Sequence, residues 1–362
     1  MAGAEAAGGS GSASGSGSGS GSGLPLPGGV QRARQLLHMS VLAQAASPCG
    51  RFLAAGNNYG EVAVFSLSAA LSAEAKEENK RPLGLFQAHS APVYSLLSTE
   101  RLLLSASDGE CKGWNWAELG RKGCREVWTR RPPCSAPSIP SFPRNALEVP
   151  EITSLELNPR DHSLVLAGGD GAVRVMDLET GTFTLQLLGH QDVVHSLALR
   201  DPQPQLLSGG EDGTVRLWDL RTGTQVQLIE VHKYQECSRP QLGKWIRCLA
   251  TDCDWMVCGG GPALTLWHLR SVTPTTVFPL PHPQHHVLFH QDLVLSGGRG
   301  PVLHQFHLSG DLRGRVPVSS PALRSLALAQ RHQHQVLTAA GNSPKIDVFT
   351  NLGYRAFSLA FA

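Results

Sequence analysis

A single arrangement of apolar, small and turn-forming residues recurs along the chain. In each copy a short apolar run leads into Ala, Ser and Gly, a turn follows, and a second apolar run ends in a large side chain; the clearest copy reads LLSGGEDGTVRLW at 206–218. Short apolar runs bounded by turn residues predict β-strands, and two runs joined by a tight turn predict a hairpin. The seven copies end in Phe65, Trp114, Met176, Trp218, Trp267, Phe306 and Phe349.

The spacing of these hairpins predicts how they assemble. Consecutive copies are 39–62 residues apart, close to the roughly 40–45 residues of a four-stranded propeller blade. We therefore predict an all-β fold, with a single seven-bladed β-propeller over residues 30–362. The small residues before each turn allow crowded inner strands to approach one another, and the large closing residue fills the wedge between neighbouring blades.

The segments outside the hairpins complete this organisation. Residues 1–29 are almost wholly Gly, Ser, Ala and Pro, a composition that predicts a disordered tail. Insertions are expected at 68–82, within the first blade, and at 131–150 and 232–244, between blades. Links between consecutive blades emerge on one face of a propeller, so the last two should share a face and 68–82 should lie on the opposite one. Residues 354–359 have alternating apolar positions and are expected to form the outer strand of the last blade.

The fourth copy carries polar residues at a fixed spacing. His190 precedes it in a Gly-His dipeptide, Ser208 lies on its second strand, Asp212 begins its turn, and Trp218 ends its third strand in a Trp-Asp dipeptide. These features resemble the WD-repeat (WD40) family. The resemblance implies a buried relay, in which the carboxylate accepts from the imidazole and the hydroxyl bonds both imidazole and indole. A catalytic triad is the alternative, but the spacing is that of the relay, so we predict no catalytic residue.

The second copy carries a similar set, which predicts a second relay. Its members are His89, Ser105, Asp108 and Trp114. In other copies Met or Phe replaces the closing Trp, as at Met176, Phe306 and Phe349. We therefore expect the repeats to serve mainly as units of packing.

Two groups of residues have side chains that can bind metals. The first consists of Cys237, Cys248, Cys253 and Cys258. Their spacing lacks the CxxC pair typical of structural zinc, so we expect small buried thiols. The second consists of His282, His285, His286, His290, His304 and His307. It lacks a helical i,i+4 pair and accompanying carboxylates, so we assign these residues to exposed loops and strands and predict no metal and no cofactor.

Charge and hydropathy narrow the classes of partner. The chain has 31 Lys and Arg against 29 Asp and Glu, a formal net charge of +2, which gives no strong electrostatic attraction to nucleic acid or to an anionic membrane. No apolar run approaches the roughly 18 residues of a membrane helix. The N-terminus lacks the apolar stretch of a signal peptide, and the eight Cys show no disulfide-scaffold spacing. We expect a soluble, reduced, intracellular protein.

Seven residues are candidates for contacts with partners. They are Arg121, Arg125, Trp128, Lys233, Tyr234, Arg239 and Arg221. The first three form a basic and aromatic patch suited to an RNA backbone or an acidic partner, with a solvated outer strand as the alternative. The next three lie in the insertion at 232–244. Arg221 ends a box at 206–221 that resembles the one in WD-repeat substrate receptors of cullin-RING ubiquitin ligases.

Longer stretches extend the resemblance beyond the repeats. The stretches at 47–78, 208–223, 237–271 and 350–361 resemble the subunit-six family of the THO complex, the WD-repeat component of the transcription–export machinery. The resemblance covers about residues 31–362. It implies a non-enzymatic scaffold of the nucleus, with nuclear speckles as a candidate location, that supports mRNA processing, splicing and export.

The same resemblance implies the partners. They would be the coiled-coil subunits five and seven of THO, with support for higher-order assembly. A substrate receptor of a cullin-RING ubiquitin ligase is the alternative function. Direct contact with RNA stays open, and no membrane partner is expected.

Overall fold

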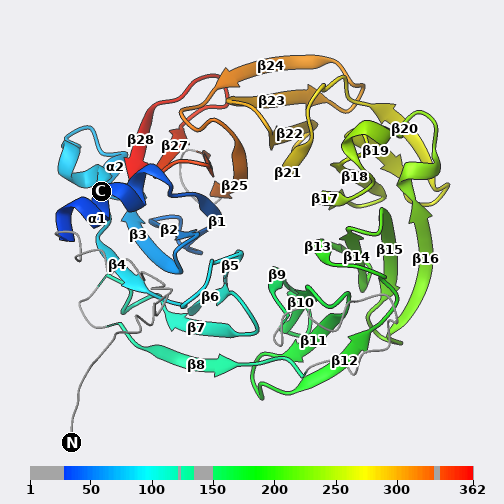
Figure 1. Cartoon of the computed structure of the whole chain (residues 1–362), viewed down its shortest axis with the longest axis horizontal. Coiled ribbons are helices and arrows are strands. Elements are labelled where there is room, and N and C mark those ends of the chain that lie inside the picture. The colour runs from blue at the N-terminus through cyan, green and yellow to red at the C-terminus, as the bar shows by residue number, and fades with distance from the viewer. Residues whose placement is uncertain (1–27, 121–123, 134–149, 330–334, 362) are drawn as a thin grey trace, which may run out of the picture.

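Seven small sheets surround a central channel (Figure 1). The computed structural model describes residues 28–120, 124–133, 150–329 and 335–361. Within them the chain forms seven four-stranded antiparallel sheets, each made of four consecutive strands in chain order. The predicted seven-bladed propeller is therefore confirmed. The prediction of a disordered tail falls on residues outside those described, except that residues 28 and 29 begin a helix.

The four strands of each blade lie side by side, in order from the channel to the rim. The inner strands are β1 (Val41–Ala46), β5 (Ser95–Ser98), β9 (Ile152–Leu157), β13 (Val194–Arg200), β17 (Ile246–Asp252), β21 (Gln284–His290) and β25 (Leu323–Ala329). The second strands are β2 (Phe52–Asn57), β6 (Leu102–Ala106), β10 (Ser163–Gly168), β14 (Gln205–Gly210), β18 (Trp255–Gly260), β22 (Leu293–Gly298) and β26 (Val336–Gly341).

The remaining strands complete the blades. The third strands are β3 (Glu61–Ser66), β7 (Cys111–Asn115), β11 (Val173–Asp177), β15 (Thr214–Asp219), β19 (Thr265–His268), β23 (Val302–His307) and β27 (Lys345–Phe349). The outer strands are β4 (Gly84–Gln87), β8 (Glu126–Arg130), β12 (Phe183–Leu187), β16 (Thr224–Glu230), β20 (Thr273–Val277), β24 (Leu312–Pro317) and β28 (Phe357–Ala360). Each predicted hairpin thus corresponds to the second and third strands of one blade.

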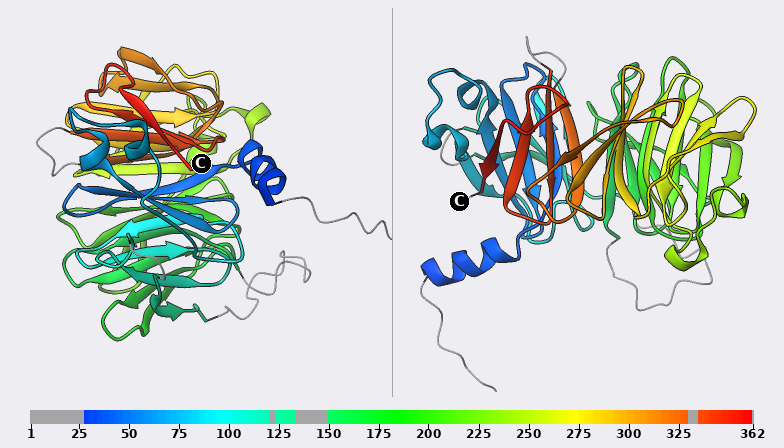
Figure 2. Two further views of the ribbon diagram at one scale, coloured as in Figure 1. Left: turned by 90° about the vertical axis from the view of Figure 1, so that its left-hand side faces the viewer. Right: turned by 90° about the horizontal axis from the view of Figure 1, so that it is seen from above.

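The two faces of the ring carry different segments. Because the strands alternate in direction, the links between blades share one face, here called the link face, with the turns between second and third strands. Helix α1 (Gly28–Leu37) and the short helices η2 (Val231–Lys233) and η3 (Pro240–Leu242) lie on the link face, whereas α2 (Leu67–Ala70) and η1 (Glu77–Lys80) lie on the opposite one (Figure 2). The insertions at 68–82 and 232–244 therefore occupy the predicted faces, and most of 131–150 lies outside the described residues.

Glycine at the end of the second strand allows the blades to pack closely at the channel. A Cβ placed on Gly209 would lie 2.7 Å from Cγ2 of Ile246 in the next blade, and one on Gly56 would lie 2.6 Å from Cγ1 of Val93. Any side chain at these positions would push the neighbouring inner strand outward. The crowding predicted for the small residues is confirmed.

The large closing residues pack between blades, as predicted. Trp218 of blade four is 2% exposed and lies in one cluster with Val165 and Val175 of blade three. Trp267 of blade five packs in the same way against Leu217 of blade four. Burial of a large aromatic side chain removes the most apolar surface from water per residue. The main cores therefore lie between the blades.

The C-terminal segment forms the outer strand of the last blade. It does so as β28, which begins three residues later than predicted because residues 351–354 form a turn closed by a bridge between Asn351 and Tyr354. Among the described residues, no strand is shared between the first and last blades. The ring closes through side chains, including a hydrogen bond of 3.0 Å from Gln44 Nε2 of β1 to the Ser325 carbonyl of β25.

Candidate functional site

The relay of blade four has the predicted geometry. Nδ1 of His190 lies 3.0 Å from Oδ2 of Asp212, and Nε2 lies 2.7 Å from Oγ of Ser208. Nε1 of Trp218 donates to the same Oγ at 2.8 Å. His190 is carried by the link into blade four, and the other residues by β14, the following turn and β15. The relay therefore ties one link to the second and third strands of its blade.

Asp212 is held ionised by donors that surround it. It accepts from the backbone N–H of Gln191 and from both N–H and Oγ1 of Thr214, at 2.8–3.1 Å. Burial acts to raise the pKa of Asp212, but the hydrogen bonds from His190, Gln191 and Thr214 outweigh it and hold the pKa well below its usual value. A buried carboxylate with this many donors stabilises the fold only while it remains charged.

This constellation cannot act as a catalytic triad. Ser208 is 0% exposed, and its hydroxyl is already bonded to both His190 and Trp218. A nucleophile must reach the substrate, which a hydroxyl enclosed between two blades cannot do. The Asp, His and Ser of blade four therefore serve the fold.

Blade two contains a second relay, but its carboxylate differs from the predicted one. Ser105 Oγ bonds His89 Nε2 at 2.7 Å and Trp114 Nε1 at 2.8 Å. His89 Nδ1, however, meets Oε1 of Glu110 at 2.9 Å. Asp108 instead forms a backbone bridge with Glu151 at the channel. The assignment of Asp108 was wrong because Glu110, just before β7, has the longer side chain that reaches the imidazole.

The basic and aromatic patch on blade two is not an open stacking surface. Arg121 lies outside the described residues, while Arg125 precedes β8 and Trp128 lies on it. A Cβ on Gly113 of β7 would lie 2.6 Å from the Trp128 ring, so the indole packs directly on that glycine. The half-buried ring therefore covers the blade, with the Arg130 guanidinium 5.9 Å from its centroid.

The other partner-binding candidates lie on separate parts of the ring. Tyr234 packs edge-on against Trp267, with ring centroids 4.9 Å apart, and Lys233 pairs with Glu230 at 2.7 Å. Arg239 is half-buried in the same link. Arg221 lies on the opposite face, is 72% exposed and contacts Asp219 at 2.8 Å. The structure does not bring these residues together into one site.

The members of the cysteine and histidine groups differ in burial. Cys237, Cys248 and Cys258 are buried as predicted, but Cys253 is exposed at a hairpin tip with φ 51°. His290 is buried, and His285, His286 and His304 are half-buried, so their assignment to exposed positions was wrong: their strands turn these side chains toward the channel or neighbouring blades. Among the described residues, no three or more His, Cys, Asp or Glu side chains come together in a way that could hold a metal ion.

Residues that are far apart in the sequence form the mouth of the channel, and the sequence pattern did not group them. The pairing of most inner strands shifts near their start, as between Val194 and Ser196, and leaves one bulged residue that lines a channel of about 820 Å³. The lining residues at this level are Leu42, Tyr94, Thr153, His195, Arg247, His285 and Arg324. Six of these residues are the bulged second residues of their inner strands, and Tyr94 directly precedes β5.

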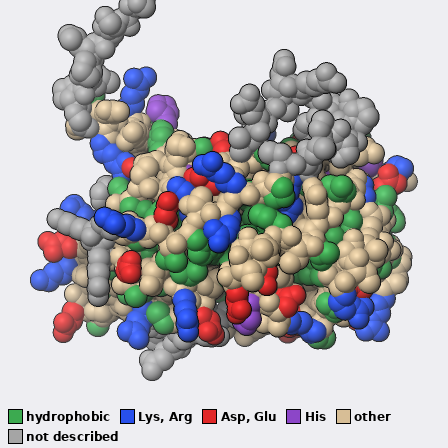
Figure 3. All heavy atoms as spheres, turned by 90° about the horizontal axis from the view of Figure 1, so that it is seen from below, with side chains coloured by type: hydrophobic (Ala, Val, Ile, Leu, Met, Phe, Trp, Pro, Cys, Tyr) green, Lys and Arg blue, Asp and Glu red, His purple; other side chains and the backbone are tan. Residues whose placement is uncertain are grey.

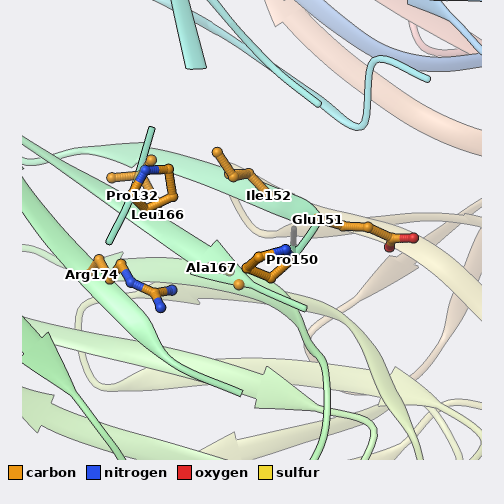
Figure 4. A pocket seen from close by; sticks show the side chains of 8 residues that line it. Pro132, Pro150, Glu151, Ile152, Leu166, Ala167 and Arg174 are labelled. Carbon is orange, nitrogen blue, oxygen red and sulfur yellow. The ribbon is translucent and has the colours of Figure 1, made fainter. Parts of the chain in front are cut away.

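A smaller hollow lies between blades two and three (Figure 4). Pro132, Pro150 and Ile152 line it together with Arg174, whose Nη1 bonds Oδ1 of Asp170 at 3.0 Å. The side chain of Glu151 points away from Arg174 (Figure 4). The side chains of its walls leave no room for a ligand. The central channel is therefore the better candidate site.

Comparison with known proteins covers nearly the whole chain. Residues 80–115 match the family model of the WD domain, G-beta repeat, and residues 145–291 match that of the nucleolar protein 10-like N-terminal domain. THO complex subunit 6 of Homo sapiens is 62% identical over 335 residues, which cover 92% of this chain and 96% of the human protein. The chain belongs to the THO complex subunit 6 family. The family homologue of Danio rerio is 53% identical over 90% of the chain and 99% of its own length.

Membership of the THO complex subunit 6 family confirms the resemblance found in the sequence. The relative from Drosophila melanogaster is still 31% identical over 90% of each chain. The matched WD domain at 80–115 includes His89, Ser105 and Trp114, three members of the blade-two relay. The helices in the described part of the chain are all too short or too polar to cross a membrane.

Proposed function

We propose that the chain is a scaffold subunit of the THO part of the transcription–export complex and acts in the nucleus. In this role it supports mRNA processing and export through contacts with other proteins. The observation that carries the proposal is the 62% identity with human THO complex subunit 6 across 92% of the chain. We further propose the coiled-coil subunits five and seven as its direct partners, because rigid loops on a propeller suit long helices.

The proposal includes the absence of enzymatic activity. The Asp, His and Ser of blade four, which were weighed as a catalytic triad, are buried, with Ser208 at 0% exposure. WD-repeat propellers present rigid loops on both faces, and function resides in those loops more than in the fold itself. Partner binding is therefore the role that the described surface supports best.

The charges on the surface favour proteins over RNA as the main partners. The net charge is +2, and the rim around β8 and β12 shows basic and acidic side chains interspersed with apolar ones (Figure 3). Binding to RNA by release of counterions needs a continuous basic surface. A rim with charges of both signs does not provide that surface, which favours proteins over RNA as the main partners.

Purification of the tagged full chain from nuclear extract tests this function. We expect subunits five and seven of THO to co-purify and to remain bound after nuclease treatment, because the contacts are between proteins. Mass spectrometry of the bound fraction provides the measurement. If both subunits are missing, or are released by nuclease, the proposed role is wrong.

Arg221 distinguishes the alternative role as a ubiquitin ligase receptor. Its guanidinium is 72% exposed and contacts only Asp219 among the described residues, so a partner can reach it. Under the ligase alternative, Arg221→Ala removes the ligase adaptor from the purified fraction. Under the THO proposal, this variant retains subunits five and seven. Arg270→Ala is the matched control, since Arg270 is 71% exposed on the same face and also pairs with an Asp.

A further inference from the structure

Four basic residues meet at the link-face mouth of the central channel. Arg247, His285 and Arg324 are the bulged residues of three consecutive inner strands, in blades five, six and seven, and all line the channel. Arg299 lies in the turn that follows β22, on the same face. The pKa of His285 is lowered to about 3, mainly by burial and further by the positive charges of Arg324, Arg247 and Arg299. The backbone of Arg299 forms a bridge with Ala322, two residues before Arg324, so the three arginines border the same mouth.

The three guanidinium groups form no direct ion pair within the described residues, although the charges of Glu211 and Glu151 act on Arg247 from farther away and partly offset the lowering of its pKa by burial. Among the described residues, no carboxylate oxygen lies within 4.0 Å of Arg247, Arg299 or Arg324. Arg324 Nε donates only to the neutral Oδ1 of Asn342, at 3.1 Å. Like charges held together without a direct ion pair repel one another, so an anion that binds among them gains their attraction without breaking an existing pair.

The carboxylates of the mouth belong to blades two to four, and one of them, Glu211, interacts electrostatically with Arg247 of blade five. Oε2 of Glu211 meets Nε2 of His195 at 2.5 Å. Burial, and then the charges of Glu151 and Asp108, raises the pKa of Tyr94, which places these two carboxylates beside the phenol. The mouth is therefore positive over blades five to seven and negative over blades two to four.

A fixed aromatic side chain borders the positive half. The Trp245 indole stacks on the His285 imidazole, with ring centroids 6.2 Å apart and an angle of 14° between the planes. Nε1 of Trp245 donates to the Leu242 carbonyl at 3.0 Å, which anchors the indole to η3 and the link into blade five. The indole is thus held in a fixed position beside His285 at the edge of the positive half.

We propose that the link-face mouth binds an acidic peptide segment of a partner protein through Arg247, Arg299 and Arg324. Guanidinium groups pair with carboxylates through parallel hydrogen bonds, and a short acidic segment can lie over the positive half alone. A single-stranded RNA fits less well, because its phosphates would continue past the carboxylates of Glu151 and Glu211. The inference concerns the isolated chain and does not depend on its assembly into THO.

Binding of labelled octaglutamate to the full chain tests the site. Fluorescence anisotropy should show binding at low salt that weakens as salt rises, since the attraction is electrostatic. The Arg247→Ala/Arg324→Ala variant should bind about tenfold or more weakly, because charge-assisted hydrogen bonds are lost. The control is Arg221→Ala/Arg270→Ala, which removes the same charge from exposed arginines on the opposite face and should bind like the parent chain.

Two further measurements keep the test decisive if the double variant folds poorly. Arg299→Glu changes an exposed turn residue and should weaken binding by a similar factor. Octaglutamate should also change tryptophan emission of the parent chain but not of Trp245→Phe. The proposal is wrong if octaglutamate does not bind, if the double variant and Arg299→Glu bind it as well as the control does, or if octauridylate binds more tightly through the same arginines.

Discussion

A chain that ends at residue 352 should aggregate instead of forming a soluble monomer. The deletion removes β28 and leaves β27 as an unpaired edge, which can pair with another chain. It also removes Leu359 and Phe361, which are 0% and 2% exposed in the core between the last and first blades. Phe361 packs edge-on against Phe65 of β3, with ring centroids 5.9 Å apart. Size-exclusion chromatography of the purified chain provides the measurement.

The closure of the ring depends on this segment because no strand is shared across it in the described residues. Arg32 of α1 contacts Glu61 at 2.9 Å and the Phe361 carbonyl at 3.4 Å, so the first helix, the first blade and the C-terminal segment meet there. Phe361→Ala alone should cost about 3–5 kcal/mol, as expected for a large aromatic side chain removed from a core.

Tyr354→Ala is the matched control for both changes. Tyr354 lies in the same segment but is 57% exposed, and substitutions at such positions usually change stability by less than about 0.5 kcal/mol. A truncated chain that is soluble, monomeric and melts like the full chain would show that the ring is closed by other contacts.

The fold could be predicted because each blade is encoded locally. A hairpin such as 206–218 contains its own strands, its turn and its closing Trp218, and repetition of the pattern specifies the ring. Helix α1 was missed, because the Gly/Ser-rich composition ends close to where the helix begins. Its residues 31–37 (QRARQLL) are nonetheless good helix formers, which is the signal that was available.

The candidate sites were harder to predict because they depend on side-chain reach and on ring closure. In blade two, Glu110 and not Asp108 pairs with His89 because its carboxylate faces the imidazole. Spacing along the chain does not specify which carboxylate does so. Arg247, Arg299 and Arg324 are spread over many residues of sequence and meet only once blades five to seven are placed side by side. Sequence pattern therefore predicts the scaffold better than it predicts the surfaces formed between repeats.

Replacement of Asp212 by Ala should destabilise the protein by roughly 2–4 kcal/mol, because it leaves buried donors without an acceptor. The donors are His190 Nδ1, Thr214 Oγ1 and the backbone N–H groups of Gln191 and Thr214. Chemical denaturation followed by circular dichroism provides the measurement. The control is Glu179→Ala, an exposed carboxylate on the neighbouring blade, which should change stability by less than about 0.5 kcal/mol.

The pH dependence of the same variant tests whether the carboxylate acts through its charge. The pKa of Asp212 is lower in the folded chain than its usual value, so the stabilisation is fully present above the unfolded pKa of about 3.9 and is lost as the pH falls toward the folded value. The difference in stability between the parent chain and Asp212→Ala should therefore narrow below about pH 4. A difference that stays constant there would assign the effect to packing, and no difference at neutral pH would show that the relay does not stabilise blade four.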